Sequence, residues 1–453
     1  MSISTIIADF VAEPAEFTEE ALYLAKRSVL DTYGAMITGV ETSAVKMALF
    51  SSSRGSCTLV GGKGEKLTPR DAAFVHGISG HELELDDTSS SNLGHPTAAV
   101  LPTVLALAEE NGESGLNLLK AFLIATEVEC KIGRIMAKSL HERGWHCSSI
   151  TGVIGAAAGA AYLMGLSREK TANAIGIAAS MASGVRENFG TLTKSVHIGK
   201  TAEDGLRAAI LARDGITASE IALEGKEGYI FEYAGLRDED GYFERVMRSM
   251  GKDWDICAPG FTIKRWPSCS SGHRPFDAFL DIAKQNEFTL SEVEKIEMGL
   301  SAASIRELRN PDPKDGEEAK FSVGFQIGLY MAGLPNVPDY YRKDVIERPE
   351  IQDAIKKSVM YEIDDYNHLP SEAGNGPAKV TVTLKDGRVF ETVRNFPVGH
   401  LTDPIPDEDL KEKFMNCSTP LLGTERSEKL YELIMNLENV SDVREITALS
   451  VRD

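Results

Sequence analysis

Residues 150–166 read ITGVIGAAAGAAYLMGL and set the character of the first half of the chain. The run is apolar, but it is short for a membrane span and consists largely of Gly and Ala. Small side chains allow the backbones of neighbouring helices to approach closely. We therefore expect a buried, closely packed helix here and no membrane association.

Helical patterns continue on both sides of this run. Thr18 is a suitable N-cap, and the apolar residues that follow it recur at helical spacing. No alternating pattern typical of a strand stands out before about residue 255. We expect helices, separated by short Gly- or Ser-containing breaks, over residues 97–110, 115–137, 149–164, 168–182 and 202–213.

The pattern changes near Ala258, Pro259 and Gly260. Residues 378–393 (AKVTVTLKDGRVFETV) alternate β-branched side chains around an Asp-Gly turn, which predicts a β-hairpin. From Pro404 onwards the chain again has helical patterns. Further candidate strands cover residues 295–300 and 359–363, and further candidate helices cover residues 276–285 and 321–331.

These patterns predict a mainly α protein with two domains. We expect a large all-helical domain from residues 1–258, completed by residues 404–453. A smaller α+β domain is expected from residues 259–403.

Composition limits the partners and the cellular compartment. The chain has 453 residues, with 48 Lys and Arg against 68 Asp and Glu, which gives a formal net charge of −20. So acidic a surface repels phosphate backbones, and we expect no nucleic-acid partner. Six scattered cysteines without a C-x-x-C pair argue against a disulfide framework, a structural zinc and an iron–sulfur cluster. The N-terminus lacks the features of a signal peptide, so we expect a cytoplasmic protein.

The first of four polar segments is HELELDDT at residues 81–88, followed by GHP at residues 94–96. Its carboxylates and imidazoles can form an acid–base pocket or a metal site. A solvated acidic loop explains the same composition equally well. The H-E-x-x-H pattern of zinc proteases is absent.

The second and third segments carry an imidazole and a group of cations. His146, within RGWHCSSIT, lies just ahead of an expected helix, where it can bind an anion, donate a proton or simply be exposed. Residues 199–201 read GKT as in a phosphate-binding loop, but Lys194 stands where such a loop needs Gly. The cations around Lys194 suit a carboxylate-rich small substrate, or else are surface lysines.

The fourth segment, KRWPSCSSGH at residues 264–273, lies at the expected start of the second domain. The spacing of Cys269 and His273 is compatible with metal ligands or with a nucleophile–base pair. A packed thiol beside an exposed imidazole is the simpler alternative. Domain junctions are favoured places for a ligand site.

In this order the four segments resemble the MmgE/PrpD family. The motifs are H-x-x-E-x-D-D-T with a following H-P, R-G-W-H, T-K-x-x-H-I-G and K-R-W-P-S-C-x-x-x-H, together with EAKFSVGFQIGLYMAG at residues 318–333. The resemblance implies a helical domain with a smaller α+β lid, a homodimer, and an active site between the domains. It also implies small polycarboxylate substrates and no metal or organic cofactor.

Carried over residue by residue, the resemblance implies that His95 is the general base or acid, oriented by Asp86 or Asp87. Lys194 and His146 complete the implied catalytic set by holding substrate carboxylates and stabilising developing charge. Further substrate contacts are expected from Thr88, Glu84, Lys264, Cys269, His273, Arg143 and Lys200.

Departures from the family's patterns bear on the reaction. Glu84, Cys269 and Phe325 stand where cis-aconitate decarboxylases resemble one another in having Asp, His and Tyr. The link between D-D-T and H-P is also shorter than in a typical 2-methylcitrate dehydratase. We expect a dehydratase-type lyase first, an iminodisuccinate-type epimerase second and a cis-aconitate-type decarboxylase third. A non-catalytic carboxylate-binding protein is the alternative of another class, and a metallohydrolase is the last.

Overall fold

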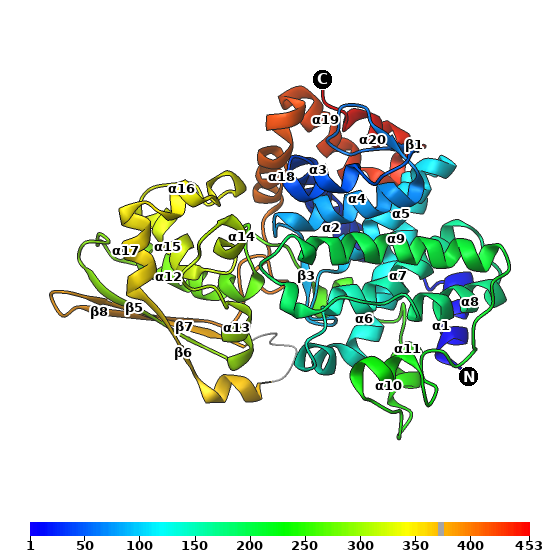
Figure 1. Cartoon of the computed structure of the whole chain (residues 1–453), viewed down its shortest axis with the longest axis horizontal. Coiled ribbons are helices and arrows are strands. Elements are labelled where there is room, and N and C mark those ends of the chain that lie inside the picture. Colours follow the sequence, from blue (N-terminus) through cyan, green and yellow to red (C-terminus); the bar gives the residue numbers. More distant parts are fainter. Residues whose placement is uncertain (370–375) are drawn as a thin grey trace. The chain divides into compact units, whose positions relative to one another are not determined.

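The computed structural model describes residues 1–369 and 376–453, which form two compact units. The first unit comprises Met1–Glu82, Asp86–Phe261 and Pro406–Asp453, and the second comprises Leu83–Leu85 and Thr262–Ile405. Helices dominate the described chain, and the second unit contains a four-stranded sheet (Figure 1). The predicted mainly α fold class is confirmed.

The first unit is a helical assembly in which α7 contacts α5, α6 and α9 (Figure 1). In the described part of the chain, no helix combines the length and apolar character needed to cross a membrane. The helices are α1 (Ile3–Ala12), α2 (Glu19–Gly39), α3 (Ser43–Leu49), α4 (Pro69–Glu82), α5 (Pro96–Asn111), α6 (Gly115–Glu142), α7 (Cys147–Leu163), α8 (Arg168–Ala179), α9 (Thr193–Arg213), α10 (Tyr229–Ala234), α11 (Tyr242–Met247), α18 (Asp407–Leu422), α19 (Thr424–Met435) and α20 (Arg444–Leu449).

The Gly/Ala run of residues 150–166 forms most of α7, as predicted. A Cβ atom on Gly155 would lie 2.5 Å from the carbonyl oxygen of Ala125 on α6. One on Gly159 would lie 2.8 Å from a methyl group of Val104 on α5. The small residues therefore allow α7 to pack directly against the backbone and side chains of its neighbours.

Several elements of the first unit differ from the predicted ones, and helix α4 lies where no helix range was predicted. Helix α9 begins at Thr193 rather than near residue 202, because the polar side chains of its first turns conceal the helical pattern. Two short strands, β1 (Arg54–Thr58) and β2 (Lys66–Leu67), pair antiparallel where no strand was expected. A further two-residue strand, β3 (Thr88–Ser89), lies in the first polar segment.

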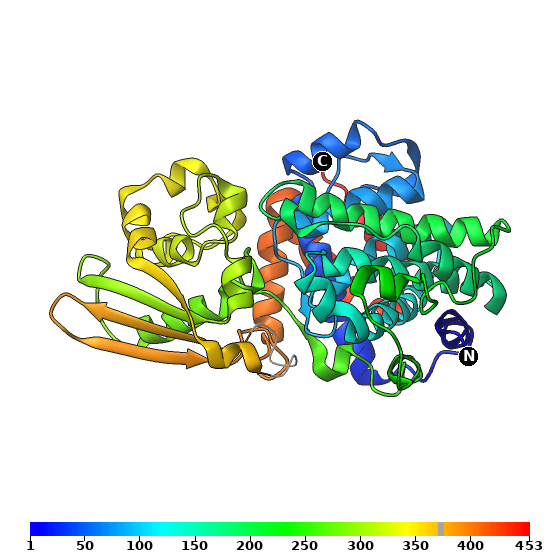
Figure 2. The same cartoon turned by 60° about the horizontal axis from the view of Figure 1, so that its bottom comes forward.

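The second unit is built on a sheet with the strand order β6-β5-β7-β8. Strand β5 pairs parallel with β6 and antiparallel with β7, and β7 and β8 form the predicted hairpin. Helices lie on one side of this sheet (Figure 2). The elements are β5 (Val293–Leu300), β6 (Ser358–Glu362), β7 (Ala378–Leu384), β8 (Val389–Arg394), α12 (His273–Gln285), α13 (Ala302–Glu307), α14 (Gly316–Ala319), α15 (Val323–Met331), α16 (Lys343–Ile346) and α17 (Pro349–Lys357), and β4 (Phe261–Thr262) precedes them.

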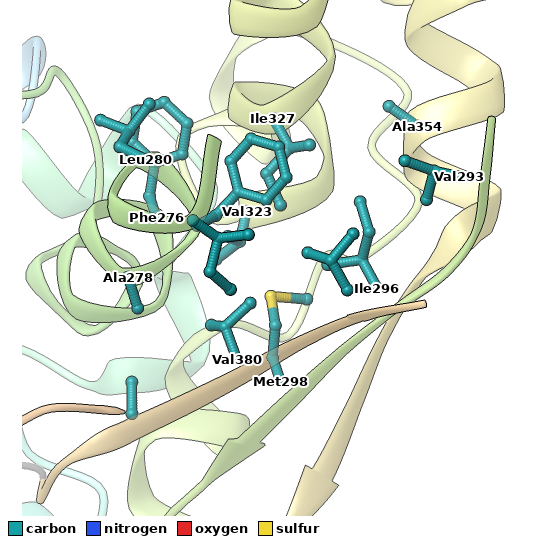
Figure 3. Close-up of a cluster of buried hydrophobic side chains, with 14 of the residues drawn as sticks. Phe276, Ala278, Leu280, Val293, Ile296, Met298, Val323, Ile327, Ala354 and Val380 are labelled. Carbon is teal, nitrogen blue, oxygen red and sulfur yellow. The ribbon is translucent and has the colours of Figure 1, made fainter. Parts of the chain in front are cut away.

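The core of the second unit lies between the sheet and its helices (Figure 3). Phe276 from α12 and Ile327 from α15 meet Met298 from β5 and Val380 from β7 in one buried cluster. Alternate residues of β7 are buried, which is the pattern of a strand with one covered face. The two-residue periodicity of this hairpin therefore predicted its strand positions correctly.

Candidate active site

Asp86 lies between two imidazoles in the first unit. Its Oδ2 atom is 2.8 Å from Nδ1 of His81 and 3.1 Å from Nδ1 of His95. The two rings meet edge to face, with centroids 4.5 Å apart. All three side chains are buried. Of the two carboxylates proposed to orient His95, the structure places Asp86 in contact with it.

Three helices position this trio. His81 lies in the last turn of α4, and His95 is the N-cap residue of α5. The backbone N–H of His95 donates to Oγ of Ser148, in the first turn of α7, at 2.8 Å. The end of one helix and the starts of two others therefore determine where the imidazoles meet the carboxylate.

Burial and close contacts shift the pKa values of Asp86 and His81 in this trio. Burial raises the pKa of Asp86, but the nearby imidazoles outweigh burial and hold this pKa well below its usual range. Burial lowers the pKa of His81 well below its usual value, although Asp86 opposes this shift. Asp86 is therefore an anion and His81 is neutral. Since a carboxylate only accepts hydrogen bonds, His81 donates its Nδ1–H and keeps Nε2 as an acceptor.

A second pair of imidazoles continues from the trio. The ring of His146, the N-cap residue of α7, lies 5.8 Å from that of His81. Nδ1 of His146 is 3.3 Å from Nδ1 of His197 on α9. Burial, with the neighbouring imidazoles, lowers the pKa of His146 well below its usual value. Burial and Lys194 lower the pKa of His197 to about 4, so both rings are neutral.

Lys194 supplies a cation beside these rings. It lies in the first turn of α9, and its Nζ is 5.0 Å from the centroid of the Phe189 ring. Phe189 in turn packs edge to face on His146, with centroids 4.9 Å apart. An aromatic face stabilises an ammonium group at this distance. The arrangement of neutral bases, one carboxylate and one cation suits acid–base chemistry on an anionic substrate.

Asp87 has a different partner from Asp86. Its carboxylate accepts from the backbone N–H of Thr97 at 3.2 Å and from the Thr97 hydroxyl at 2.5 Å. Burial raises the pKa of Asp87 to about 7. Asp86 is thus the carboxylate that contacts His95, while Asp87 binds Thr97 in the first turn of α5. Thr88 is half-buried in β3.

Two residues predicted to contact substrate, Lys200 and Arg143, lie away from the rings around Asp86 in the first unit. Lys200, two turns along α9 from Lys194, forms an ion pair with Asp204 and donates to the carbonyl oxygen of Met181 at 3.0 Å. Arg143 follows the last residue of α6 and is exposed. The structure does not bring either side chain into the group of rings around Asp86.

The remaining predicted residues belong to the second unit. There Nζ of Lys264 lies 2.7 Å from Oε2 of Glu84, and both side chains are buried. Glu84 has a φ angle of 55°, which is an uncommon backbone conformation for a residue other than glycine. The left-handed backbone at Glu84 and the buried ion pair together define the conformation of the three-residue segment Leu83–Leu85.

Cys269 and His273 begin the helical part of the second unit. Nε2 of His273 lies 3.2 Å from the carbonyl oxygen of Ser268, and the ring is buried rather than exposed. Cys269 is half-buried, and its backbone N–H donates to the carbonyl of Lys320 at 2.9 Å. Phe325 is fully buried, with its ring centroid 5.0 Å from that of Tyr341.

The trio is also chemically capable of metal binding. His81, Asp86 and His95 each offer one ligand atom, and these atoms all lie within 4.8 Å of one another. Two imidazoles and a carboxylate are a ligand set that transition metals accept. In the structure, Nδ1 of His81 is within hydrogen-bond distance of Asp86 at 2.8 Å, and Nδ1 of His95 contacts the same oxygen at 3.1 Å.

Comparisons with known proteins agree with the motifs. A model of the MmgE/PrpD N-terminal domain matches residues 5–238, and a model of the MmgE/PrpD C-terminal domain matches residues 266–439. The chain belongs to the MmgE/PrpD family.

Relatives within the MmgE/PrpD family include several decarboxylases. Cis-aconitate decarboxylase from Homo sapiens is 31% identical, over 95% of this chain and 90% of the relative. Cis-aconitate decarboxylase from Mus musculus is 30% identical, over 95% of this chain and 89% of the relative. Cis-aconitate decarboxylase from Aspergillus terreus is 25% identical, over 96% of this chain and 92% of the relative. This MmgE/PrpD chain is therefore related along nearly its whole length to enzymes that act on a polycarboxylate.

Three residues around the site have no individual role predicted from the sequence of this MmgE/PrpD chain. The motifs include His81 only as one imidazole of the first polar segment, and they give no role to His197 or Phe189. The signal for His197 was its spacing of three from Lys194, which places both on one face of a helix. That signal depended on extending α9 back to Thr193.

Proposed function

We propose that this MmgE/PrpD protein is a lyase that moves a proton at a carbon next to a carboxylate of a small polycarboxylate. The observation that carries the proposal is the contact of 3.1 Å between Nδ1 of His95 and the buried Asp86 carboxylate. A carboxylate beside Nδ1 fixes the tautomer of an imidazole and increases the basicity of Nε2. His95 is thereby suited to exchange a proton with substrate at Nε2.

Lys194 and His146 have supporting roles in this proposal. Proton transfer next to a carboxylate places additional negative charge on a molecule that is already an anion. The ammonium group of Lys194 offsets that charge, and the neutral His146 ring offers a hydrogen bond without repelling a cation. In the second unit, the resemblance of motifs extends the proposal to Lys264, Glu84, Cys269 and His273 as substrate-binding residues.

Decarboxylation of cis-aconitate is the reaction that the relatives favour. In this reaction the bond between carbon and one carboxylate breaks, and carbon dioxide leaves. The electron pair stays on the carbon skeleton, which takes up one proton and becomes a five-carbon unsaturated dicarboxylate. A protonated His95 supplies that proton and is reprotonated from solvent. Decarboxylation therefore moves ahead of the dehydratase-type reaction that the sequence placed first.

Dehydration or epimerisation is the second candidate. It is favoured by Cys269 and Phe325, which stand where the decarboxylases resemble one another in having His and Tyr. Phe325 is buried against Tyr341 in an apolar cluster, so it has no proton to transfer. Both reactions begin with removal of a proton by a base, and His95 in its neutral form performs that step.

Proton NMR in D₂O tests the proposal with citrate, 2-methylcitrate, cis-aconitate, malate, tartrate and iminodisuccinate. Loss of cis-aconitate with release of carbon dioxide and deuterium in the product supports the decarboxylase. A new alkene from a hydroxy acid, or inversion of configuration, supports the second candidate. Binding of these acids without deuterium exchange in any of them contradicts the lyase and favours a carboxylate-binding protein.

Removal of metal ions provides an independent test of cofactor use. We expect full activity after treatment with dipicolinate and gel filtration, because the imidazoles and Asp86 exchange protons among themselves. Loss of activity that returns with added Zn²⁺ or Fe²⁺ would contradict this expectation. It would reassign His81, Asp86 and His95 as metal ligands.

A further inference from the structure

The proposed mechanism uses His95 and Asp86 but leaves His81 without a role. We propose that His81 is a positioning residue that acts on His95 through their shared carboxylate, Asp86. His81 thereby sets the strength of the attraction between the Asp86 carboxylate and a protonated His95. That attraction in turn determines how readily His95 releases its proton. This inference rests on the proposed role of His95 in proton transfer.

The geometry shows that His81 has the closer contact with the shared atom. Both imidazoles face the same carboxylate oxygen, Oδ2 of Asp86, through their Nδ1 atoms. His81 is at 2.8 Å and His95 is at 3.1 Å. Because an ionised carboxylate can only accept, the favourable arrangement places a proton on each Nδ1. His81 meets this oxygen through a hydrogen bond and His95 through an ion-pair contact, so the two imidazoles compete for one oxygen.

Burial makes this competition effective. Asp86 is fully buried, and only 1% of His81 and 9% of His95 is exposed. In so little water, a second N–H on the carboxylate oxygen stabilises the anion and reduces its attraction for the first imidazole. A neutral His81 does this without bringing a charge that would repel a protonated His95.

Hydrogen bonding of His81 is confined to the carboxylate that it shares with His95. A buried polar atom without a partner destabilises a fold, so the side chain of His81 keeps its position at a cost. Among the described residues, none forms a hydrogen bond with Nε2 of His81, although that atom is buried. The only described contact of its polar atoms is with Asp86, the group that holds His95.

Other titratable groups near the trio are the same in every variant proposed below. The imidazoles of His146 and His197 and the ammonium of Lys194 face it from α7 and α9. Asp87 interacts electrostatically with Asp86 and with Asp31 of α2. Because these groups are retained, a difference between variants at position 81 reports on the hydrogen bond to Asp86.

Two substitutions separate the hydrogen bond from the shape of the side chain. His81→Asn places an amide N–H near the position of Nδ1 and retains a donor for Asp86. His81→Phe retains a planar ring and removes the donor. We expect His81→Asn to keep kcat within about fivefold of the wild type, whereas His81→Phe lowers it roughly 10–100-fold, the usual range for a residue that orients a catalytic group.

The pH profile distinguishes positioning from general destabilisation. Without a donor at residue 81, Asp86 holds the protonated form of His95 more strongly. We expect the part of the kcat/KM pH profile that His95 controls to move to higher pH in His81→Phe by roughly 0.5–1 unit, with KM little changed. This is the acidic limb if His95 acts as a base and the basic limb if it acts as an acid. His81→Asn should leave the limb in place. Equal losses in both variants with an unmoved limb, or wild-type behaviour of His81→Phe, would overturn the inference.

A measurement without turnover separates this inference from the proposed function. The His95 ring resonance, assigned by its loss in His95→Gln, is titrated by NMR in each variant. Its midpoint should rise in His81→Phe and stay in place in His81→Asn, even if no acid in the substrate panel reacts. An unchanged midpoint in His81→Phe would contradict the inference. If His81→Phe does not fold, His81→Met provides a donor-free side chain of adaptable shape.

Discussion

His95 combines two positions that rarely coincide in one residue. It caps the start of α5, where its backbone N–H donates to Ser148, and its side chain reaches the buried Asp86. The backbone hydrogen bond fixes the position of the His95 backbone, and the contact with Asp86 fixes the orientation of its imidazole ring. At the scale of single residues, the site therefore depends on pairs of contacts rather than on any one side chain.

Replacement of His95 by glutamine tests its role in proton transfer. His95→Gln keeps a polar side chain but removes the titrating ring, so we expect turnover to fall roughly 10²–10⁴-fold. Substrate binding, measured by isothermal titration calorimetry, should remain detectable because Lys194 and His146 are unchanged. Near-normal turnover in this variant would contradict the assignment of His95.

His76 shows how burial of an imidazole couples stability to pH. Its Nε2 accepts from the backbone N–H of Val60 at 3.1 Å, and burial lowers its pKa to about 4. The unfolded chain binds a proton on this ring below about pH 6.5, whereas the folded chain does so only below about pH 4. Stability from the neutral ring is therefore present above pH 6.5 and is lost as the pH falls towards 4.

We expect His76 to contribute about 2–3 kcal/mol to the loss of unfolding free energy between pH 7 and pH 4.5. His76→Gln offers Val60 an acceptor that does not titrate, so its unfolding free energy should fall less over this interval. Urea unfolding of both proteins at the two pH values measures the difference. Parallel losses in the two proteins would show that His76 does not carry this dependence.

At the scale of elements, the Gly and Ala residues of α7 allow this helix to pack closely against its neighbours in the first unit. Its small residues bring the backbones of α5 and α6 close, and its first turn carries His146 and Ser148 into the site. Close packing therefore contributes to geometry as well as to stability.

Gly155→Ala tests this packing. Alanine favours a helix over glycine by about 1 kcal/mol, but the added methyl group would lie 2.5 Å from the Ala125 carbonyl oxygen. We expect a net destabilisation of about 1–3 kcal/mol, because backbone cannot move aside as a side chain can.

Gly34→Ala on α2 is the matched control. There the nearest atom, at 3.2 Å, belongs to the Phe414 side chain, which can shift. Thermal unfolding of both variants should show a clearly lower midpoint for Gly155→Ala. Equal midpoints would mean that α6 and α7 can separate without cost.

At the scale of the whole molecule, the chain returns to the first unit after completing the second. Helix α18 packs against α2, where Lys413 pairs with Asp31, and Ser450 hydrogen-bonds Tyr33. The last segment therefore buries a face of α2 that includes the carboxylate of Asp31.

Removal of this segment should unfold the first unit. We expect a chain of residues 1–405 to lose much of its helical circular dichroism and to be cut rapidly within α2 by a protease. A chain of residues 1–450, which keeps α18, α19 and α20, is the control and should resemble the full protein. Protection of α2 in the shorter chain would contradict a structural role for the C-terminal segment.

The sequence by itself determined the elements whose signals are local. The hairpin of β7 and β8 follows from alternating side chains around an Asp-Gly turn, and the start of α2 follows from the Thr18 cap, whose hydroxyl accepts from the backbone N–H of Ala21 at 3.1 Å. The ordered motifs also identified the family, and they predict His95, His146 and Lys194 as site residues. Only tertiary structure decided that Asp86 rather than Asp87 meets His95, and that His81 shares the same oxygen. The reason is physical: these contacts join the end of α4 to the starts of α5 and α7, and no local pattern encodes the distance between helix ends that packing alone sets.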